Sequence, residues 1–299
     1  MIDAHVHFYT ARDLARVAGG LPYALPQPHP LTGYLDRLID AGRKPRLINN
    51  VHLSILPDSE NVFAGFDELA ALQARDPARY GGIAGIGTIL ADPAYATAAR
   101  LAHPQVKGIR MVLHDRAPES VGAGAYSGAA WRELYARLRP DQHLHVYAQD
   151  PATTLEVMAQ LPEEVPLVID HLGTCRPERG TDDPAFLKLL ATAKARGNTW
   201  FKGPGYRTST DAAVVAAFAG RIIDTLGPGR LVLGASDAPH VGADHDGRPF
   251  AESYTPLGAL DFAADVAARV ARATGIAAET LLSGAAAEMF DPSATRAYQ

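Results

Sequence analysis

Two histidines near the start of the chain, His5 and His7, are spaced so that both can act on one atom. Residues at positions i and i+2 of a β-strand point to the same side of it, and the run that holds them has strand composition. His171 follows a second apolar run, and Asp237 follows a third. If the ends of these strands meet in the fold, three imidazoles and one carboxylate form a single reactive centre.

Such a centre can do one of two kinds of chemistry. Neutral imidazoles and a carboxylate suit zinc or a similar divalent ion such as manganese, so His5, His7, His171 and Asp237 are candidate ligands of one metal ion. Without a metal, the histidines can donate hydrogen bonds to an oxyanion while the aspartate acts as general base. Because the chain has a single cysteine, Cys175, a cysteine-clustered zinc site and a disulfide scaffold are excluded.

Three arginines form a second set of candidates. Arg110 lies inside an apolar run, Arg116 follows that run, and Arg207 follows another. Guanidinium groups pair with carboxylates through two parallel hydrogen bonds, so the three residues predict a small anionic ligand. The alternative for Arg116 is an ordinary surface position. Lys202, close to Arg207 in the sequence, is either a ligand or a residue of the wall, and the sequence leaves both open.

The elements that must position these residues are eight short runs with strand character. Several are apolar without alternation, as in parallel strands covered on both faces. Helical spacing lies between them, as where Trp131, Leu134, Tyr135 and Leu138 share one helix face. The repeated order of strand and helix predicts an α/β fold, one (β/α)8 TIM barrel in a single domain over residues 1–299. The eight runs are Ile2–His7, Arg46–His52, Gly82–Gly87, Val106–Leu113, His143–Tyr147, Leu167–Asp170, Thr199–Gly203 and Arg230–Gly234.

The alternative architecture is a doubly wound open sheet. That fold favours a glycine-rich phosphate turn after the first strand, whereas this chain continues from His7 into Phe8 and Tyr9. Three Asp-Pro pairs are typical of helix starts, because aspartate caps free N–H groups and proline loses no bond at the first helical position. These pairs are Asp92-Pro93, Asp150-Pro151 and Asp183-Pro184.

The connections differ in length with their direction. Those that run from strand to helix are long, as in Phe8–Thr32, His114–Ala129 and Ser236–Pro256, whereas those from helix to strand are short. Long loops in compact domains are usually functional, and in a barrel the loops after the strands build the active site. The loops and the candidate residues therefore point to the same face.

Composition excludes several classes of protein. The 299 residues are 47% hydrophobic and 20% charged, which is globular composition. No apolar run reaches the roughly 20 residues of a membrane span, and the net charge of −5 disfavours a nucleic-acid-binding protein. The first residues have neither a basic segment nor a long apolar one, so we expect a cytoplasmic protein without a targeting signal. The oligomeric state is left open.

An ordered set of motifs resembles the amidohydrolase superfamily, and within it the branch that holds 2-pyrone-4,6-dicarboxylate lactonase and sugar lactonases. The resemblance spans nearly the whole chain. The matching segments are Ile2–His7, Lys107–Arg110, Val168–Gly173, Lys202–Arg207, Leu233–Asp237 and Leu281–Gly284.

The resemblance implies a distorted TIM barrel that hydrolyses a lactone or another activated ester. By resemblance, His5, His7 and His171 polarise the substrate carbonyl, directly or through one divalent ion. Asp237 then takes a proton from the attacking water.

The resemblance also implies how substrate is held. In the pyrone lactonase, arginines and a tyrosine hold carboxylates, and Arg110, Arg116, Arg207 and Tyr147 match them in order and character. Ser54 matches a further hydroxyl contact.

Three departures from the family pattern narrow this expectation. Thr174 stands where the pyrone lactonase pattern has an arginine, which puts the pyrone dicarboxylate itself in doubt. Ala285 stands where the terminal motif usually has asparagine. The run that holds Arg110 ends in Met111-Val112-Leu113. The carbamylated lysine that bridges two metals in other branches therefore has no counterpart, and at most one metal is implied.

We therefore expect an enzyme that opens the lactone ring of a carboxylated or sugar-acid compound. A metal-dependent decarboxylase with the same four residues and a lactone isomerase are the alternatives within the superfamily. A carboxylate-binding protein without catalysis is the alternative from another class, and Asp237 disfavours it because anion binding does not favour an extra carboxylate.

Overall fold

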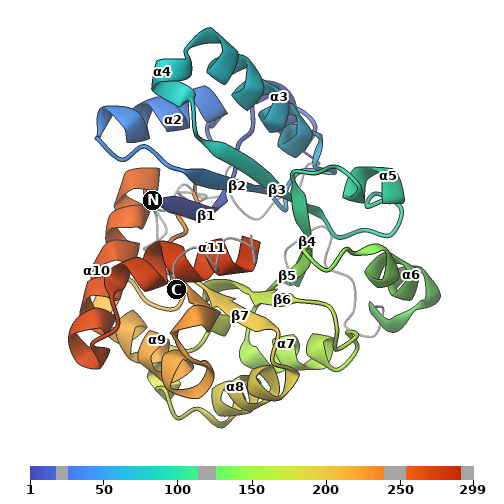
Figure 1. Cartoon of the computed structure of the whole chain (residues 1–299). Coiled ribbons are helices and arrows are strands. Elements are labelled where there is room, and N and C mark those ends of the chain that lie inside the picture. The colour runs from blue at the N-terminus through green and yellow to red at the C-terminus, as the bar shows by residue number, and fades with distance from the viewer. Residues whose placement is uncertain (18–25, 114–125, 239–253, 291–299) are drawn as a thin grey trace.

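The computed structural model describes all residues except 18–25, 114–125, 239–253 and 291–299. Eight parallel strands are hydrogen-bonded in chain order, and a bridge from Val6 to Ala238 joins the segment after the last strand to the first. Most of the helices lie outside this ring (Figure 1), and the arrangement confirms the predicted (β/α)8 barrel. The strands are β1 (Ile2–Val6), β2 (Leu47–Val51), β3 (Ala84–Leu90), β4 (Val106–Leu113), β5 (His143–Ala148), β6 (Leu167–Ile169), β7 (Thr199–Lys202) and β8 (Leu231–Val232).

The helices differ widely in length. Their bounds are α1 (Ala11–Leu14), α2 (Leu31–Asp40), α3 (Glu60–Arg75), α4 (Pro77–Tyr80), α5 (Ala98–Leu101), α6 (Ala129–Arg137), α7 (Pro151–Met158), α8 (Pro184–Arg196), α9 (Ala212–Leu226), α10 (Pro256–Thr274) and α11 (Ala285–Phe290). Shorter helical turns are η2 (Asp170–Gly173), η3 (Pro177–Arg179), η4 (Pro228–Arg230) and η5 (Thr280–Gly284).

Two of the three predicted Asp-Pro helix starts are confirmed. Asp150 and Asp183 cap α7 and α8 with their side chains, each with proline at the first turn. The prediction at Asp92 is wrong, because its carboxylate caps only a turn, accepting from the backbone N–H groups of Ala94 and Tyr95. Helix α5 starts later, at a separate cap from Thr97.

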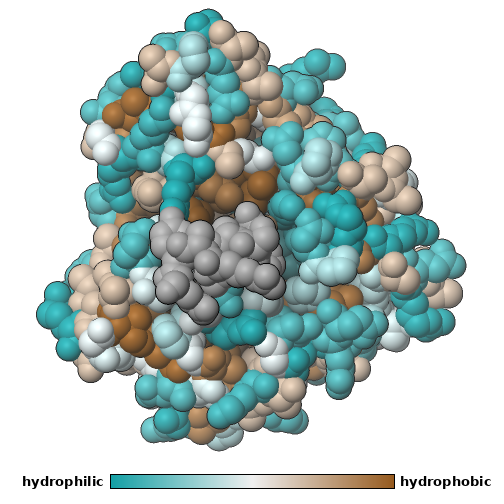
Figure 2. All heavy atoms as spheres, viewed as in Figure 1, coloured by the Kyte–Doolittle hydropathy of each residue, from teal (hydrophilic) through white to brown (hydrophobic). Residues whose placement is uncertain are grey.

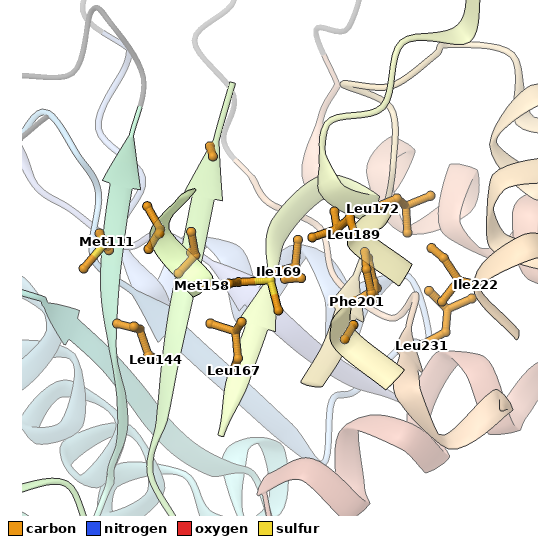
Figure 3. Packing of buried hydrophobic residues seen from close by; sticks show 14 of the residues in the cluster. Met111, Leu144, Met158, Leu167, Ile169, Leu172, Leu189, Phe201, Ile222 and Leu231 are labelled. Carbon is orange, nitrogen blue, oxygen red and sulfur yellow. The ribbon is translucent and has the colours of Figure 1, made fainter. Parts of the chain in front are cut away.

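Buried apolar residues form two layers that matter for the site. The larger lies between strands and helices and includes Leu144, Leu167 and Phe201 of successive strands together with Leu189 and Ile222 (Figure 3). The second cluster joins strand residues such as Ile2, Val168 and Val232 to Ala286, Met289 and Phe290 of α11. Helix α11 lies across the centre of the ring (Figure 1). One end of the barrel is therefore filled by apolar packing, and polar side chains gather toward the carboxyl ends of the strands.

The outer surface agrees with this layering. Hydrophilic residues cover most of the rim in this view, and hydrophobic ones show in smaller patches between them (Figure 2). Among the helices that the structure describes, none combines the length and apolar character needed to cross a membrane.

Candidate active site

The histidine pair is placed by an irregularity in β1. Between Asp3 and Val6 the register against β2 shifts, so that β1 carries one residue more than its neighbour there. Asp3 points to the helix layer, where it accepts a hydrogen bond of 2.6 Å from Tyr34. Beyond the shift, the rings of His5 and His7 lie 4.6 Å apart, with their Nε2 atoms separated by 3.1 Å. The prediction that they share one side is confirmed, and the bulge turns that side toward the barrel interior, whereas Asp3 before it points to the helix layer.

His171 joins the cluster through unusual backbone geometry. Consecutive residues of an extended chain point to opposite sides, yet the side chains of Asp170 and His171 both reach the centre of the barrel. The φ angles of His171 and Leu172 are 47° and 56°, in the left-handed region that side chains rarely adopt. This turn directly after β6 delivers two adjacent polar residues to one place.

Asp237 meets the three histidines at the mouth of the barrel. Its Oδ1 lies 3.3 Å from Nε2 of His5 and 3.7 Å from Nε2 of His7, and its Oδ2 lies 3.4 Å from Nε2 of His171. Its backbone φ is 49°, a conformation that costs roughly 1 kcal/mol or more and often marks functional sites. Tyr206 donates to Oδ2 at 2.9 Å. All four predicted residues therefore come together, although the sequence reasoning did not include Tyr206.

A second carboxylate, Asp170, was not singled out in the sequence. Its Oδ1 lies 2.5 Å from Nζ of Lys202, and its Oδ2 lies 3.3 Å from Nη2 of Arg110 and 3.1 Å from Nε2 of His145. All these side chains are almost completely buried. The available signal was that Asp170 adjoins His171 and that Lys202 ends an apolar strand, where a lone cation needs a buried anion. Lys202 thus lies at the centre of the site.

The protonation states follow from burial and neighbouring charge. Burial lowers the pKa of His171 to about 3 and also lowers the pKa values of His5 and His7. Burial alone would raise the pKa of Asp237, but interactions with His171, His5 and Arg207 hold that pKa well below its usual range. At neutral pH the cluster therefore contains neutral imidazoles and ionised carboxylates.

These groups fit one divalent cation by donor type. Three sets have ligand atoms within 4.8 Å of one another: His5, His7 and Asp237; His5, His145 and Asp170; Asp170, His171 and Asp237. Among the described residues, both ring nitrogens of His171 and Nδ1 of His145 are buried without a hydrogen-bond partner, which is typical of atoms that serve a ligand. Zinc and similar ions take such imidazole and carboxylate ligands. Whether His5 offers a lone pair at Nε2 is decided by its tautomer.

The predicted substrate-binding residues differ in how they relate to this centre. The Nε of Arg207 lies 3.4 Å from Oδ2 of Asp237, its side chain is 25% exposed, and its guanidinium carbon lies 5.6 Å from the ring centre of Tyr147. Arg207 therefore extends from the buried cluster to the protein surface. Arg110 is buried and donates to the carbonyl of His52 at 2.8 Å as well as pairing with Asp170.

Two predicted positions remain, Ser54 and Arg116. Ser54 lies half-buried in the connection from β2 to α3, and within the described part of the chain no hydrogen bond joins it to the histidines or Asp237. Arg116 lies outside the described residues. Of the other histidines, His145 belongs to the cluster, and His52 lies beside it with Nδ1 bonded to Ser59 at 3.0 Å.

The fold and this centre define a (β/α)8-barrel protein whose imidazoles and carboxylates gather at the carboxyl ends of the strands. The chain belongs to the amidohydrolase family described by the Amidohydro_2 model, which matches residues 2–275. No curated protein matches it.

Several solved structures share the fold. A structure from Acinetobacter baumannii, described as a candidate 2-pyrone-4,6-dicarboxylic acid hydrolase with citric acid bound, is 18% identical over 97% of this chain and 98% of its own, with a TM-score of 0.73. A candidate hydrolase of the same description from Pseudomonas putida is 24% identical over 97% and 96%, with a TM-score of 0.64. The 5-carboxyvanillate decarboxylase from Sphingomonas paucimobilis is 13% identical over 97% of both chains, with a TM-score of 0.53.

Proposed function

We propose that this protein hydrolyses the lactone ring of a carboxylated or sugar-acid compound. The observation that carries the proposal is the contact of an ionised carboxylate, Asp237, with His5 and His171 at the carboxyl ends of the strands. The partly exposed Arg207 lies beside it. Two solved structures with this fold are described as candidate hydrolases of a dicarboxylated pyrone, and one holds citric acid, a tricarboxylate. An anionic substrate agrees with the guanidinium groups at this site.

In the proposed reaction, the histidines polarise the substrate carbonyl and Asp237 acts as the general base. The lactone carbonyl oxygen faces the ring N–H groups of His5 and His171, which stabilise the oxyanion as water adds to the carbonyl carbon. Asp237 takes a proton from that water and returns it to the ring oxygen when the carbon–oxygen bond breaks. Neutral His7 donates its Nδ1 proton to the carbonyl of Val51 at 2.7 Å, so its Nε2 presents a lone pair toward the centre. A divalent cation in this site would be held by His7, His171 and Asp237 and would supply Lewis-acid polarisation of the same carbonyl.

Decarboxylation is the second candidate function. The 5-carboxyvanillate decarboxylase shares the fold, and the three overlapping ligand sets suit an enzyme that depends on one metal. Such a reaction cleaves a carbon–carbon bond without consuming water. Lactone isomerisation moves only a proton and is the third.

Product analysis on a panel of lactones and aromatic carboxylates tests these functions. Lactone hydrolysis consumes one water and releases one acid equivalent, decarboxylation releases CO2, and isomerisation does neither. We expect acid release, with the purified protein assayed before and after chelation. Loss of activity that zinc or manganese restores supports the metal-assisted form, and retained activity supports direct polarisation. A panel that yields CO2 but no acid contradicts the proposal.

Arg207→Ala is expected to raise KM for an anionic substrate about tenfold or more, because a hydrogen bond to a charged group contributes roughly 1.5–3 kcal/mol. The matched measurement uses a neutral lactone with the same ring. For that analogue we expect little change in KM, since no carboxylate is bound. Equal effects on both substrates would show that Arg207 does not bind the substrate charge.

A further inference from the structure

The side chain of Lys202 has three hydrogen-bonding neighbours at the heart of the site. Its Nζ lies 2.5 Å from Oδ1 of Asp170, 3.1 Å from the carbonyl oxygen of Gly203 and 2.7 Å from Nδ1 of His5. A lysine ammonium has three N–H donors and no acceptor. The carboxylate and the carbonyl oxygen can only accept, and 1% of the residue is exposed. The third N–H therefore points to His5, and Nδ1 of His5 accepts it.

This contact determines where the proton of His5 resides. A neutral imidazole carries a proton on one nitrogen and a lone pair on the other. With the lone pair at Nδ1, the proton of His5 is on Nε2. That atom lies 3.1 Å from Nε2 of His7, which carries a lone pair because Nδ1 of His7 donates to the carbonyl of Val51. Donors and acceptors match along the whole chain from Lys202 through His5 and His7 to Val51.

We propose that Lys202 is a positioning residue that holds His5 in the tautomer with its proton on Nε2. In this form His5 is a hydrogen-bond donor toward Asp237 and toward any oxyanion in the site, and it has no lone pair for a metal ion at Nε2. His7, with the opposite tautomer, keeps its lone pair. Two histidines that look equivalent in the sequence therefore have opposite roles, and a metal ion in this site is held without His5.

Removal of the ammonium reverses this arrangement. In Lys202→Met, Oδ2 of Asp170 is an acceptor 3.7 Å from Nδ1 of His5. A carboxylate requires a donor, so the proton moves to Nδ1 and the lone pair to Nε2. His5, His7 and Asp237 then present three ligand atoms within 4.8 Å of one another. The variant should therefore bind a divalent cation more tightly than the unaltered protein.

The tautomer can be measured in the unaltered protein by 15N NMR of histidine-labelled, metal-free samples. Protonated and unprotonated ring nitrogens differ strongly in chemical shift, and a His5→Asn variant identifies the His5 signals. We expect a protonated Nε2 and an unprotonated Nδ1 for His5, and the reverse for His7. A protonated Nδ1 on His5 overturns the proposal. This measurement does not require Lys202→Met to fold.

Metal binding supplies the second test, by calorimetric titration with Zn²⁺ at neutral pH. We expect Lys202→Met to bind Zn²⁺ at least tenfold more tightly than the unaltered protein. Lys107→Met is the matched control, since Lys107 also pairs with a carboxylate, Asp141, at 2.7 Å, but its side chain is 22% exposed. We expect no change for it. Equal affinity in the unaltered protein and Lys202→Met, or an equal gain in both variants, overturns the proposal.

The consequence for catalysis rests on the proposed function, whereas both tests are independent of any substrate. If the protein does not hydrolyse lactones but the His5 tautomer is as inferred, the lactone panel shows no acid release, whereas the NMR and titration results are still those expected. If the tautomer is wrong, hydrolysis can still be observed. The two failures are therefore distinguishable.

Discussion

Asp237→Asn is expected to lower kcat for lactone opening by about 10²–10⁴-fold, the usual contribution of a positioned general base. The amide has nearly the shape of the carboxylate but cannot take the proton of water. Asparagine also tolerates the left-handed backbone found at this position, where φ is 49°. The carboxamide oxygen can still accept the hydrogen bond that Tyr206 donates. Activity should therefore fall without loss of the fold, which steady-state kinetics and circular dichroism together measure.

Tyr206→Phe is the matched control for this result. It removes one hydrogen bond to Oδ2 of the ionised Asp237 but leaves the base itself in place. A hydrogen bond to a charged group contributes roughly 1.5–3 kcal/mol, so we expect kcat to fall by about 10²-fold at most and by less than in Asp237→Asn. An unchanged kcat in Asp237→Asn would remove Asp237 from the role of general base.

Asp170→Asn is expected to lower the free energy of unfolding by about 3–5 kcal/mol, the loss typical when one partner of a buried ion pair is removed. Lys202 and Arg110 both pair with this carboxylate and are buried. The neutral amide leaves both cations without a counter-charge. Urea unfolding at neutral pH measures the difference.

The stabilisation that ionised Asp170 provides should decrease at low pH. Burial favours a raised pKa for Asp170, but His171, Lys202 and His145 together hold that pKa well below the ordinary value of 3.8. A carboxyl group whose pKa is lower in the folded than in the unfolded state stabilises the folded state at any pH above its unfolded-state pKa. This stabilisation is lost as the pH falls toward the folded-state pKa. The difference between the unaltered protein and Asp170→Asn should therefore persist at neutral pH and shrink below about pH 4.

Asp141→Asn is the control for burial. Asp141 also meets two cations, Lys107 at 2.7 Å and Arg139 at 3.0 Å, but its side chain is 37% exposed. Exposed pairs contribute about 1 kcal/mol or less, so we expect a correspondingly small loss. If Asp170→Asn lowers the free energy of unfolding no more than the small amount expected for Asp141→Asn, the Asp170 network is not important for stability.

Local sequence signals predicted the scaffold well, because they depend on neighbouring residues. The run Val106–Leu113 is a strand with the predicted bounds, and the other seven runs agree with the observed strands to within a few residues. The Asp92 prediction failed because a capping side chain stabilises one turn, whereas continuation of a helix depends on packing further along the chain.

Placement at strand ends also predicted the first part of the site. His5 and His7 are two residues apart on one strand, and His171 and Asp237 directly follow apolar runs. Parallel strands of a barrel bring their carboxyl ends to one mouth, so this proximity follows from the order of elements. Arg207 lies at the same mouth for the same reason.

The sequence by itself thus determined the barrel, the face that carries the candidate centre and four residues of that centre, since strand periodicity and element order encode them. Only the tertiary structure decided the partners of those residues. The bulge in β1 and the left-handed turn at His171 re-aim side chains against the simple alternation. Barrel closure brings Lys202 within 2.7 Å of His5, 197 positions away in the chain. Hydrogen-bond donors and acceptors are matched across such distances by three-dimensional contact, which local sequence patterns do not contain.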